Sequence, residues 1–540
     1  MSNRTRMAFV FGVLGITLTY LLVETRYITH FPLGADEFLD MYVLQMFRGG
    51  LPYRDFTPPK TVLAFYLDLP VFAAVGDPWR AMLAVKLEHA ILAAATMFGG
   101  ALVLGRRLPT AAVLGALAML VTMSTFLERS AELHVDQIAA VFGFLSLLAL
   151  IERRPMLAGL FAAGAFLSTQ KGVYFVLAGQ AGLLAELGRV RTARMRATWL
   201  RFTFSSAAIL AAYLAFWSLF ASPRTVIRDV FLDRSIVQIA STVIYTIRSH
   251  YWLQTFVQNP LFYGIAAAGA VVLLGRWPRA AEDDRFAILA PYILALSLLA
   301  AWHKQPWPYF IALVVPPLFI VNAVFLAELR HRPRAAFVLA IIAAAIPLAR
   351  FDVTMRRDNT FQRATFTTAL SLLAPNETYI DGASMIYTQE QAASEFVWLD
   401  WVRMKALRDA SPAQLMPLIH RIDTARPKLM LLNYRTAALP PTLQLYARSQ
   451  FAPLWGNILY YAPVIAPPVF ELHFDGTYLA DRPARIDDID IAAGARLPLH
   501  RGWHTMRASH PIRLRLLAPP GTPFDPRFAA GGELLRNGFD

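Results

Sequence analysis

The feature that most constrains this chain is a succession of eleven long apolar runs in its first 350 residues. A helix needs roughly 20 residues to cross about 30 Å of hydrocarbon, and these runs are near that length. They lie at 7–23, 82–104, 109–127, 137–151, 155–168, 173–187, 202–221, 258–275, 286–301, 307–328 and 335–349. Only 16% of the residues are charged, against about 25% in a soluble domain. The sequence therefore predicts a polytopic α-helical membrane protein with about eleven transmembrane helices in residues 1–350.

The remaining composition excludes several functions. There is no cysteine, which excludes a disulfide framework, a thiolate nucleophile and a cysteine-bound zinc ion. The formal net charge is +14, but the basic residues cluster in short loops between the apolar runs, as membrane topogenesis requires. We therefore expect the lipid bilayer as a partner and no nucleic acid. No small-residue cleavage site follows the run at 7–23, so we expect an uncleaved first helix.

The arginines decide the topology. Segment 61–76 is apolar but contains Asp68 and Pro70, which favours a juxtamembrane helix in an outer loop at 31–80. With that segment outside, every arginine-rich short loop is cytoplasmic. These loops hold Arg4, Arg6, Arg106, Arg107, Arg153, Arg154, Arg189, Arg191, Arg194, Arg196, Arg201, Arg276, Arg279, Arg285, Arg330, Arg332 and Arg334. The sequence thus predicts a multi-pass protein of the inner (plasma) membrane, with a cytoplasmic N-terminus and an extracytoplasmic chain after Arg350.

The same assignment sends four polar loops, at 33–60, 127–136, 168–172 and 302–309, to the outer face, where we expect them to share one site. The first loop places Asp36 and Glu37 soon after the first helix. One interpretation is a solvated helix start, where the helix dipole favours anions.

The other interpretation is catalytic, because this loop resembles the first luminal loop of the C-type (GT-C) glycosyltransferases that use polyprenyl-phosphate sugars. Protein O-mannosyltransferases and lipid A aminoarabinose transferases belong to this class. The resemblance is carried by Asp36-Glu37, by the run GLPYRDF at 50–56 and by the run PPK at 58–60. It implies catalytic carboxylates at Asp36 and Glu37. It further implies donor-phosphate contacts at Arg54 and Lys60, and acceptor or sugar contacts at Tyr53 and Asp55.

The order of residues in this loop departs from the aminoarabinose transferases. There the lysine precedes the two prolines and follows a glutamate, whereas here Lys60 follows Pro58-Pro59 and Thr57 precedes them. Glutamate-mediated metal binding is therefore not carried over. We predict no metal ligands, and a divalent metal is allowed but not indicated.

The second polar loop reads ERSAELHVDQ at 128–137. It resembles the segment where these families place a second acidic residue, which implies a catalytic role for Asp136. We also expect a donor-phosphate contact at Arg129 and an acceptor or sugar contact at His134. Two alternatives stay open: a local ion-paired cap formed by Glu128, Arg129 and Glu132, and a metal site at Glu132, His134 and Asp136.

The remaining two outer loops supply cations and aromatic rings. We expect donor-phosphate or lipid contacts at Lys171, His303, Lys304 and Tyr309. The alternative is an interfacial belt of aromatic residues with snorkelling lysines, which accounts equally well for Trp302 and Trp307.

A mechanism follows from these side chains. A carboxylate in a partly dehydrated cavity has a raised pKa and is a better base, so Asp36 would take the acceptor's hydroxyl proton. The leaving lipid phosphate needs positive charge more than it needs an acid. We therefore predict an inverting glycosyltransferase that moves a sugar from a polyprenyl-phosphate donor to a lipid, glycan or protein hydroxyl on the extracytoplasmic face. The alternative is a secondary transporter or flippase for a lipid-linked or small anionic substrate.

After residue 350 the apolar runs shorten to strand length. Runs at 378–381, 428–433 and 458–462, separated by helical segments, predict an extracytoplasmic α/β domain at 351–465. Alternation at 470–474, 486–491 and 512–517 predicts a small β-rich unit in 466–540, with a loose tail after Pro519. That unit would bind glycan through Tyr478, Trp503 or His504, or else these rings pack inside it.

Overall fold

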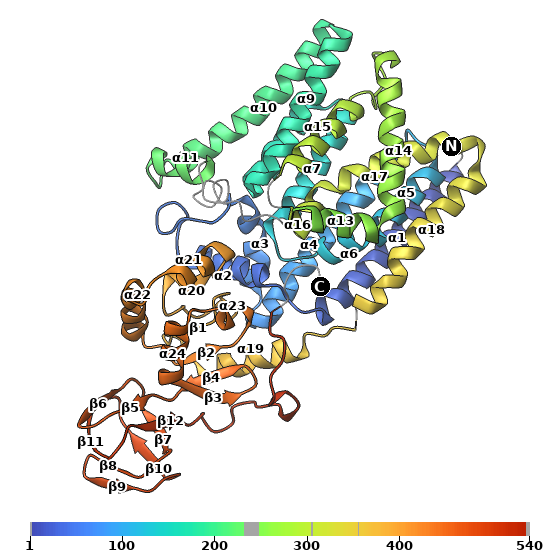
Figure 1. Cartoon of the computed structure of the whole chain (residues 1–540). Coiled ribbons are helices and arrows are strands. Elements are labelled where there is room, and N and C mark those ends of the chain that lie inside the picture. Colours follow the sequence, from blue (N-terminus) through green and yellow to red (C-terminus); the bar gives the residue numbers. More distant parts are fainter. Residues whose placement is uncertain (1–2, 232–247, 304–305, 355, 536–540) are drawn as a thin grey trace. The chain divides into compact units, whose positions relative to one another are not determined.

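The computed structural model describes residues 3–231, 248–303, 306–354 and 356–535 (Figure 1). Contacts divide the chain into two units. The first unit comprises Met1–Phe31 and Val43–Arg357, and the second comprises Pro32–Tyr42 and Asp358–Gly538. This division differs from the predicted domains, because residues 32–42 join the second unit and the two predicted C-terminal parts form one unit.

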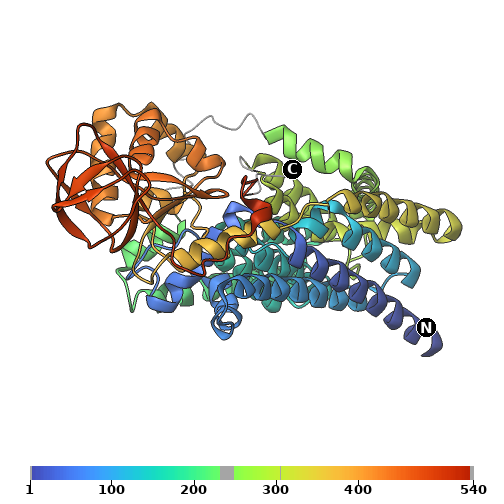
Figure 2. The ribbon, with the colours of Figure 1, turned by 90° about the horizontal axis from the view of Figure 1, so that it is seen from below.

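The first unit is a bundle of helices that lie side by side (Figures 1 and 2). Its apolar helices are α1 (Asn3–His30), α3 (Leu63–Ala74), α4 (Pro78–Leu104), α5 (Thr110–Thr122), α7 (Val135–Ile151), α8 (Pro155–Ser168), α9 (Val173–Val190), α10 (Ala193–Trp217), α14 (Pro260–Arg276), α15 (Leu289–Trp302), α16 (Pro308–Val314), α17 (Pro316–Glu328) and α18 (Pro333–Thr354). Each of the eleven predicted crossings coincides with one of these helices or, at 307–328, with the pair α16 and α17. Three further helices are α6 (Ser124–Arg129), α11 (Pro223–Phe231) and α13 (Arg248–Gln258).

Length separates these helices into two groups. Within the described residues, five helices are long and apolar enough to cross a membrane, and the pair α16 and α17, bent by 47°, makes a sixth if it is one span. The shorter apolar helices, of 10–17 residues, include α3, α5, α7, α8 and α15. The bundle also leaves large apolar side chains exposed, among them Phe11 at 67%, Leu22 at 73% and Phe204 at 69%. Such a surface suits contact with lipid.

Small residues let the helices approach closely. Gly159 on α8 faces α10, and a Cβ atom there would lie 2.4 Å from the carbonyl oxygen of Phe202. Gly143 on α7 faces α9, where a Cβ atom would lie 2.3 Å from the ring of Phe175. Small residues at helix contacts are typical of membrane bundles, where packing rather than water expulsion drives association.

Three arginine-rich loops lie at the same end of the bundle. Glu152 forms ion pairs with Arg107 and Arg285, at 3.5 and 3.4 Å. Arg153 donates a hydrogen bond to the carbonyl oxygen of Glu282. The sequence assigned all three loops to one side of the membrane, and the structure brings them together.

The second unit begins with the start of α2 (Ala35–Gly49) and continues from α19 (Thr360–Leu372). A four-stranded sheet follows, in the order β1 (Tyr379–Ile380), β2 (Leu429–Leu431), β4 (Ile458–Tyr461) and β3 (Phe451–Trp455). Only β1 and β2 are parallel. The helices of this part are α20 (Ser394–Val397), α21 (Trp401–Asp409), α22 (Pro412–Ala425), α23 (Tyr434–Ala437) and α24 (Pro441–Gln450). The three predicted strands are therefore present.

Two small antiparallel sheets form the rest of this unit. One has the order β10 (Arg496–Leu499), β7 (Gly476–Ala480), β12 (Ile512–Leu516) and β5 (Val464–Ile465). The other has the order β6 (Val469–Leu472), β11 (Gly502–Arg507), β8 (Ala484–Ile486) and β9 (Ile489–Ile491). Tyr478 is fully buried and donates a hydrogen bond to the carbonyl oxygen of Phe474, so it packs inside the unit and cannot contact a glycan.

The tail after Pro519 is not loose over its described length. Trp455 donates a hydrogen bond to the carbonyl oxygen of Asp525, and Gln362 donates one to that of Leu534. Leu534 and Leu535 are buried. Burial of these two adjacent leucines helps to hold a segment whose glycine and proline content had predicted a loose tail.

Candidate active site

Asp136 and Lys171 form the centre of the polar cluster in the first unit. Asp136 lies in the first turn of α7, completely buried, and its Oδ2 atom accepts a hydrogen bond of 2.6 Å from Lys171 Nζ. The other oxygen, Oδ1, is buried and has no hydrogen-bond partner among the residues that the structure describes. A buried carboxylate needs a compensating charge, and Lys171 supplies it. Asp136 keeps one acceptor atom beside that cation.

The turn that carries Lys171 is fixed by a glycine. Lys171 lies in a 3₁₀ turn, Gln170–Gly172, between α8 and α9. A Cβ atom at Gly172 would lie 2.1 Å from the backbone of Ala165, so only glycine fits against α8 here. The ammonium group also lies 4.3 Å from the centre of the Tyr309 ring, which attracts it electrostatically.

His134 completes this group. It is the N-cap of α7, and its Nδ1 atom accepts a hydrogen bond of 3.3 Å from the backbone N–H of Asp136. Its ring stacks on Tyr309 at 4.1 Å between centres. Burial lowers the pKa of His134 well below its ordinary value, and the charges of Lys60 and Lys171 act in the same direction. The imidazole is therefore neutral at pH 7.

Lys60 reaches the same cluster from the first outer loop. It is half-buried, and its charge acts on both His134 and Asp136. The next residue, Thr61, donates a hydrogen bond of 2.8 Å to the carbonyl oxygen of Phe166 on α8. This bond holds the segment near the end of α8 that precedes Lys171.

A second aromatic pair extends the cluster. His303 is the C-cap of α15, and its Nδ1 atom lies 2.8 Å from the hydroxyl of Tyr174. Its ring stacks on Phe310, the neighbour of Tyr309, at 3.9 Å. Lys304 falls outside the described residues.

Arg129 is bound in a local pair. Its Nη1 atom donates a hydrogen bond of 2.8 Å to Glu132, and both side chains are buried. The ion pair between these two residues was one of the alternatives open from the sequence. In this structure Glu132 faces Arg129, and no three His, Asp or Glu side chains of the described chain are grouped as metal ligands.

The sequence did not identify a second buried pair next to this loop. His89 on α4 bonds to Asp68 on α3 through Nε2, at 3.0 Å. Its Nδ1 atom lies 2.9 Å from the carbonyl oxygen of Glu132. The available signal was the presence of ionisable residues inside two apolar helices, where they rarely lie without a partner.

Three side chains of the GLPYRDF turn form contacts with residues outside the Asp136–Lys171 cluster. Tyr53 has a left-handed φ of 66°, and its hydroxyl lies 2.6 Å from that of Tyr213 on α10. Arg54 and Asp55 form an exposed ion pair. The guanidinium of Arg54 and the backbone N–H of Leu51 lower the pKa of Asp55 to about 2.

Asp36 and Glu37 lie in the second unit, in the first turn of α2. Glu37 is buried, and its Oε2 atom accepts a hydrogen bond of 2.7 Å from the backbone N–H of Gly34. Asp36 is half-buried. The helix start of the first interpretation is therefore present, but it is not solvated at Glu37, whose buried carboxylate accepts this bond.

The structure thus brings residues of all four predicted outer loops together. The cluster comprises Lys60, His134, Asp136, Lys171 and Tyr309, with His303 beside it. It offers two ammonium groups, neutral imidazole and aromatic faces, and one unused carboxylate oxygen. The two ammonium groups suit a phosphate group, and the aromatic faces suit an apolar tail attached to it.

Comparison with known proteins identifies the fold. ArnT from Cupriavidus metallidurans bound to undecaprenyl phosphate is similar, with a TM-score of 0.59 and 12% identity over 85% of this chain and 98% of that chain. Its apo state gives a TM-score of 0.57 at 11% identity, over 83% and 97%. The archaeal oligosaccharyltransferase AglB from Archaeoglobus fulgidus, in complex with an inhibitory peptide and a dolichol-phosphate, gives 0.51 at 11% identity, over 90% and 76%.

No protein-family model and no curated protein sequence matches the chain. The fold is nevertheless clear: this chain has the fold of the GT-C membrane glycosyltransferases. The predicted fold class, a helical membrane part followed by a C-terminal domain with β-sheets, is confirmed.

Proposed function

We propose that the protein is an inverting glycosyltransferase that moves a sugar from a polyprenyl-phosphate carrier to a hydroxyl of a lipid, glycan or protein acceptor. The observation that carries this proposal is the cluster of Lys171, Lys60, His134 and Tyr309 around buried Asp136. The common fold with an ArnT bound to undecaprenyl phosphate supports the choice of donor.

In this proposal the donor phosphate binds at Lys171 and Lys60. The bond between C1 of the sugar and the phosphate oxygen breaks, and the electron pair leaves with the phosphate. Two ammonium groups stabilise the charge that develops there, more strongly than they would in water because the site is partly buried. Tyr309 and His303 contribute ring faces along the apolar part of the carrier.

We assign the base to Asp36 on the resemblance of its loop to the first luminal loop of the GT-C transferases. The acceptor oxygen attacks C1 from the face opposite the phosphate, which inverts the anomeric centre, and its proton passes to the Asp36 carboxylate. Glu37 supports this role by holding the start of α2, through its bond from the N–H of Gly34. We assign the reaction to the extracytoplasmic face of the inner membrane and place the N-terminus in the cytoplasm, as the arginine distribution indicates.

The test is transfer by the full-length protein in proteoliposomes. Undecaprenyl-phosphate-linked mannose, glucose and aminoarabinose serve as donors, and lipid extract and cell-wall glycan from the source membrane serve as acceptors. The expected result is release of undecaprenyl phosphate with a labelled acceptor, reduced at least about 100-fold by Asp36→Asn.

Two outcomes would overturn this proposal. The first is undiminished turnover in Asp36→Asn. The second is movement of the intact lipid-linked sugar between leaflets without cleavage of its phosphate bond, which is the behaviour of a flippase.

A further inference from the structure

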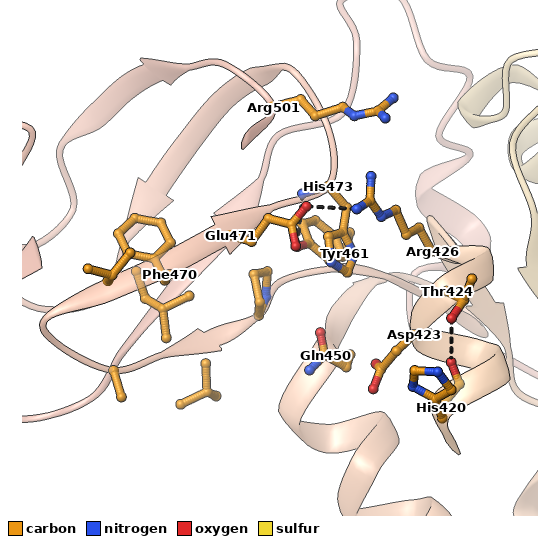
Figure 3. A pocket seen from close by; sticks show the side chains of 15 residues that line it. His420, Asp423, Thr424, Arg426, Gln450, Tyr461, Phe470, Glu471, His473 and Arg501 are labelled. Carbon is orange, nitrogen blue, oxygen red and sulfur yellow. Dashed lines mark hydrogen bonds and ion pairs between the residues drawn. The ribbon is translucent and has the colours of Figure 1, made fainter. Parts of the chain in front are cut away.

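The second unit contains a polar cleft that the proposed reaction does not use (Figure 3). It has a volume of about 820 Å³ and lies between the α/β part and the small sheets of this unit. The polar side chains that line it include Asp423, Arg426, Gln450, Glu471, His473 and Arg501. Asp423 lies on α22, Arg426 directly follows that helix and Gln450 ends α24, whereas the last three come from the β-rich part.

The charges of this cleft balance. Two carboxylates, Asp423 and Glu471, stand with two guanidinium groups, Arg426 and Arg501. Arg426 donates a hydrogen bond of 2.7 Å to Glu471, and both side chains are about one-third exposed, so the pair can exchange partners cheaply. A phosphate would meet two carboxylates here, whereas a sugar hydroxyl can donate to a carboxylate and accept from an arginine.

An exposed aromatic ring stands beside this lining. Trp503 on β11 is 72% exposed, and in the antiparallel pairing it lies directly opposite Glu471 on β6. Paired residues of adjacent strands point to the same face of a sheet, so the indole neighbours the cleft wall. The flat apolar face of this exposed indole suits the C–H face of a sugar ring.

We propose that this cleft, with Trp503 at its edge, binds a neutral oligosaccharide. The inference rests on the proposed function in one respect: it makes a sugar chain the acceptor, or the part of the acceptor that the enzyme holds. Asp423, Glu471, Arg426 and Gln450 pair with hydroxyl groups, and Trp503 stacks on a ring. Sugar binding itself does not depend on transfer activity.

The test measures sugar binding to the full-length protein in nanodiscs, prepared without glycoside detergents. The probes are maltotetraose, cellotetraose, α-1,6-mannotetraose and chitotetraose, observed by saturation-transfer NMR. At least one probe should bind, and Trp503→Ala and Glu471→Gln should each lower its affinity about tenfold. Trp401→Ala is the matched control, since Trp401 is 50% exposed on α21, outside the cleft, and it should leave affinity unchanged.

Failure of this inference is distinguishable from failure of the proposed function. Absence of binding by all four probes, or equal loss in Trp401→Ala, overturns the cleft as a sugar site even if transfer is measured. Binding of phosphorylated sugars without binding of the neutral ones also overturns it. Sugar binding without any sugar transfer supports the cleft as a sugar site and overturns the proposed glycosyltransferase activity. Equal melting temperatures of the variants exclude unfolding as the cause.

Discussion

Lys171 Nζ lies 2.6 Å from Asp136 Oδ2, and the two residues come from loops 35 positions apart in the chain. Asp136 is completely buried, while 18% of the Lys171 side chain is exposed. The pair therefore joins a buried anion to a cation that a ligand can reach. Its removal should affect both stability and donor binding, and the two effects can be separated.

Replacing Lys171 with methionine leaves the Asp136 carboxylate buried without its cation. Breaking a buried pair in this way costs about 3–5 kcal/mol, so we expect a large drop in melting temperature. The double variant Lys171→Met, Asp136→Asn removes both charges and should recover most of that stability. Its affinity for undecaprenyl phosphate, measured by native mass spectrometry, should stay at least about tenfold below that of the unaltered protein. Full recovery of affinity would make Lys171 a structural residue only.

Gly172→Ala tests the positioning of Lys171 without altering any charge. The new Cβ atom would lie 2.1 Å from the backbone of Ala165, so the turn has to move away from α8. We expect a cost of about 1–3 kcal/mol and weaker binding of undecaprenyl phosphate. Gly99→Ala on α4 is the matched control, since a Cβ atom there meets nothing within 4 Å. Equal behaviour of the two variants would contradict the role given to Gly172.

Replacement of Asp36 and replacement of Glu37 should have different effects on sugar transfer. Glu37→Gln keeps an oxygen that can accept from the N–H of Gly34, so we expect a loss of about 1 kcal/mol or less and transfer within a few-fold of the unaltered rate. Asp36→Asn should instead abolish transfer with little change in melting temperature. Both quantities are measured on the same purified samples. A complete loss of transfer in Glu37→Gln would move the base to that residue.

The Asp68–His89 pair should be required for folding. Asp68→Ala leaves buried His89 without its carboxylate partner, and we expect a loss of about 3–5 kcal/mol. Asp77→Ala provides the comparison, because Asp77 is an exposed N-cap of α4 that bonds to the N–H of Arg80. Loss of such a cap costs about 1 kcal/mol. The measurement is thermal melting in detergent, and equal shifts for the two variants would contradict a structural role for the pair.

His473 should make the second unit less stable at mildly acidic pH. Burial lowers the pKa of His473, and the charge of Arg426 acts in the same direction. The carboxylates of Glu471 and Asp423 oppose this, and Arg501 adds to it. The pKa of His473 in the folded protein is below the unfolded value of about 6.5. Titration of His473 therefore leaves the free energy of unfolding undiminished above pH 6.5. Below that pH the free energy of unfolding decreases, because His473 binds a proton in the unfolded chain but not in the folded unit.

The measurement for His473 is the melting temperature between pH 7.5 and pH 5. His473→Gln should flatten this profile. His500→Gln is the control, since His500 is 97% exposed. A profile that His473→Gln does not change would contradict this assignment.

Much of the fold was accessible from the sequence, because apolar length and arginine placement act locally along the chain. Each predicted crossing coincides with a helix or the bent pair α16 and α17, and β1, β2 and β4 lie where strand-length runs occur. The tail was predicted wrongly, since glycine and proline content signals loose structure while Leu534 and Leu535 are buried against distant residues.

For the site, the sequence determined which residue types reach the outer loops, and it marked Asp136, Lys171 and His134 as candidates. Only the tertiary structure decided their partners. In the folded chain Asp136 pairs with Lys171, Glu132 pairs with Arg129, and Asp68 pairs with His89 in a buried position. The physical reason is that burial makes charge pairing obligatory, and which groups are buried together depends on how helices distant in sequence pack.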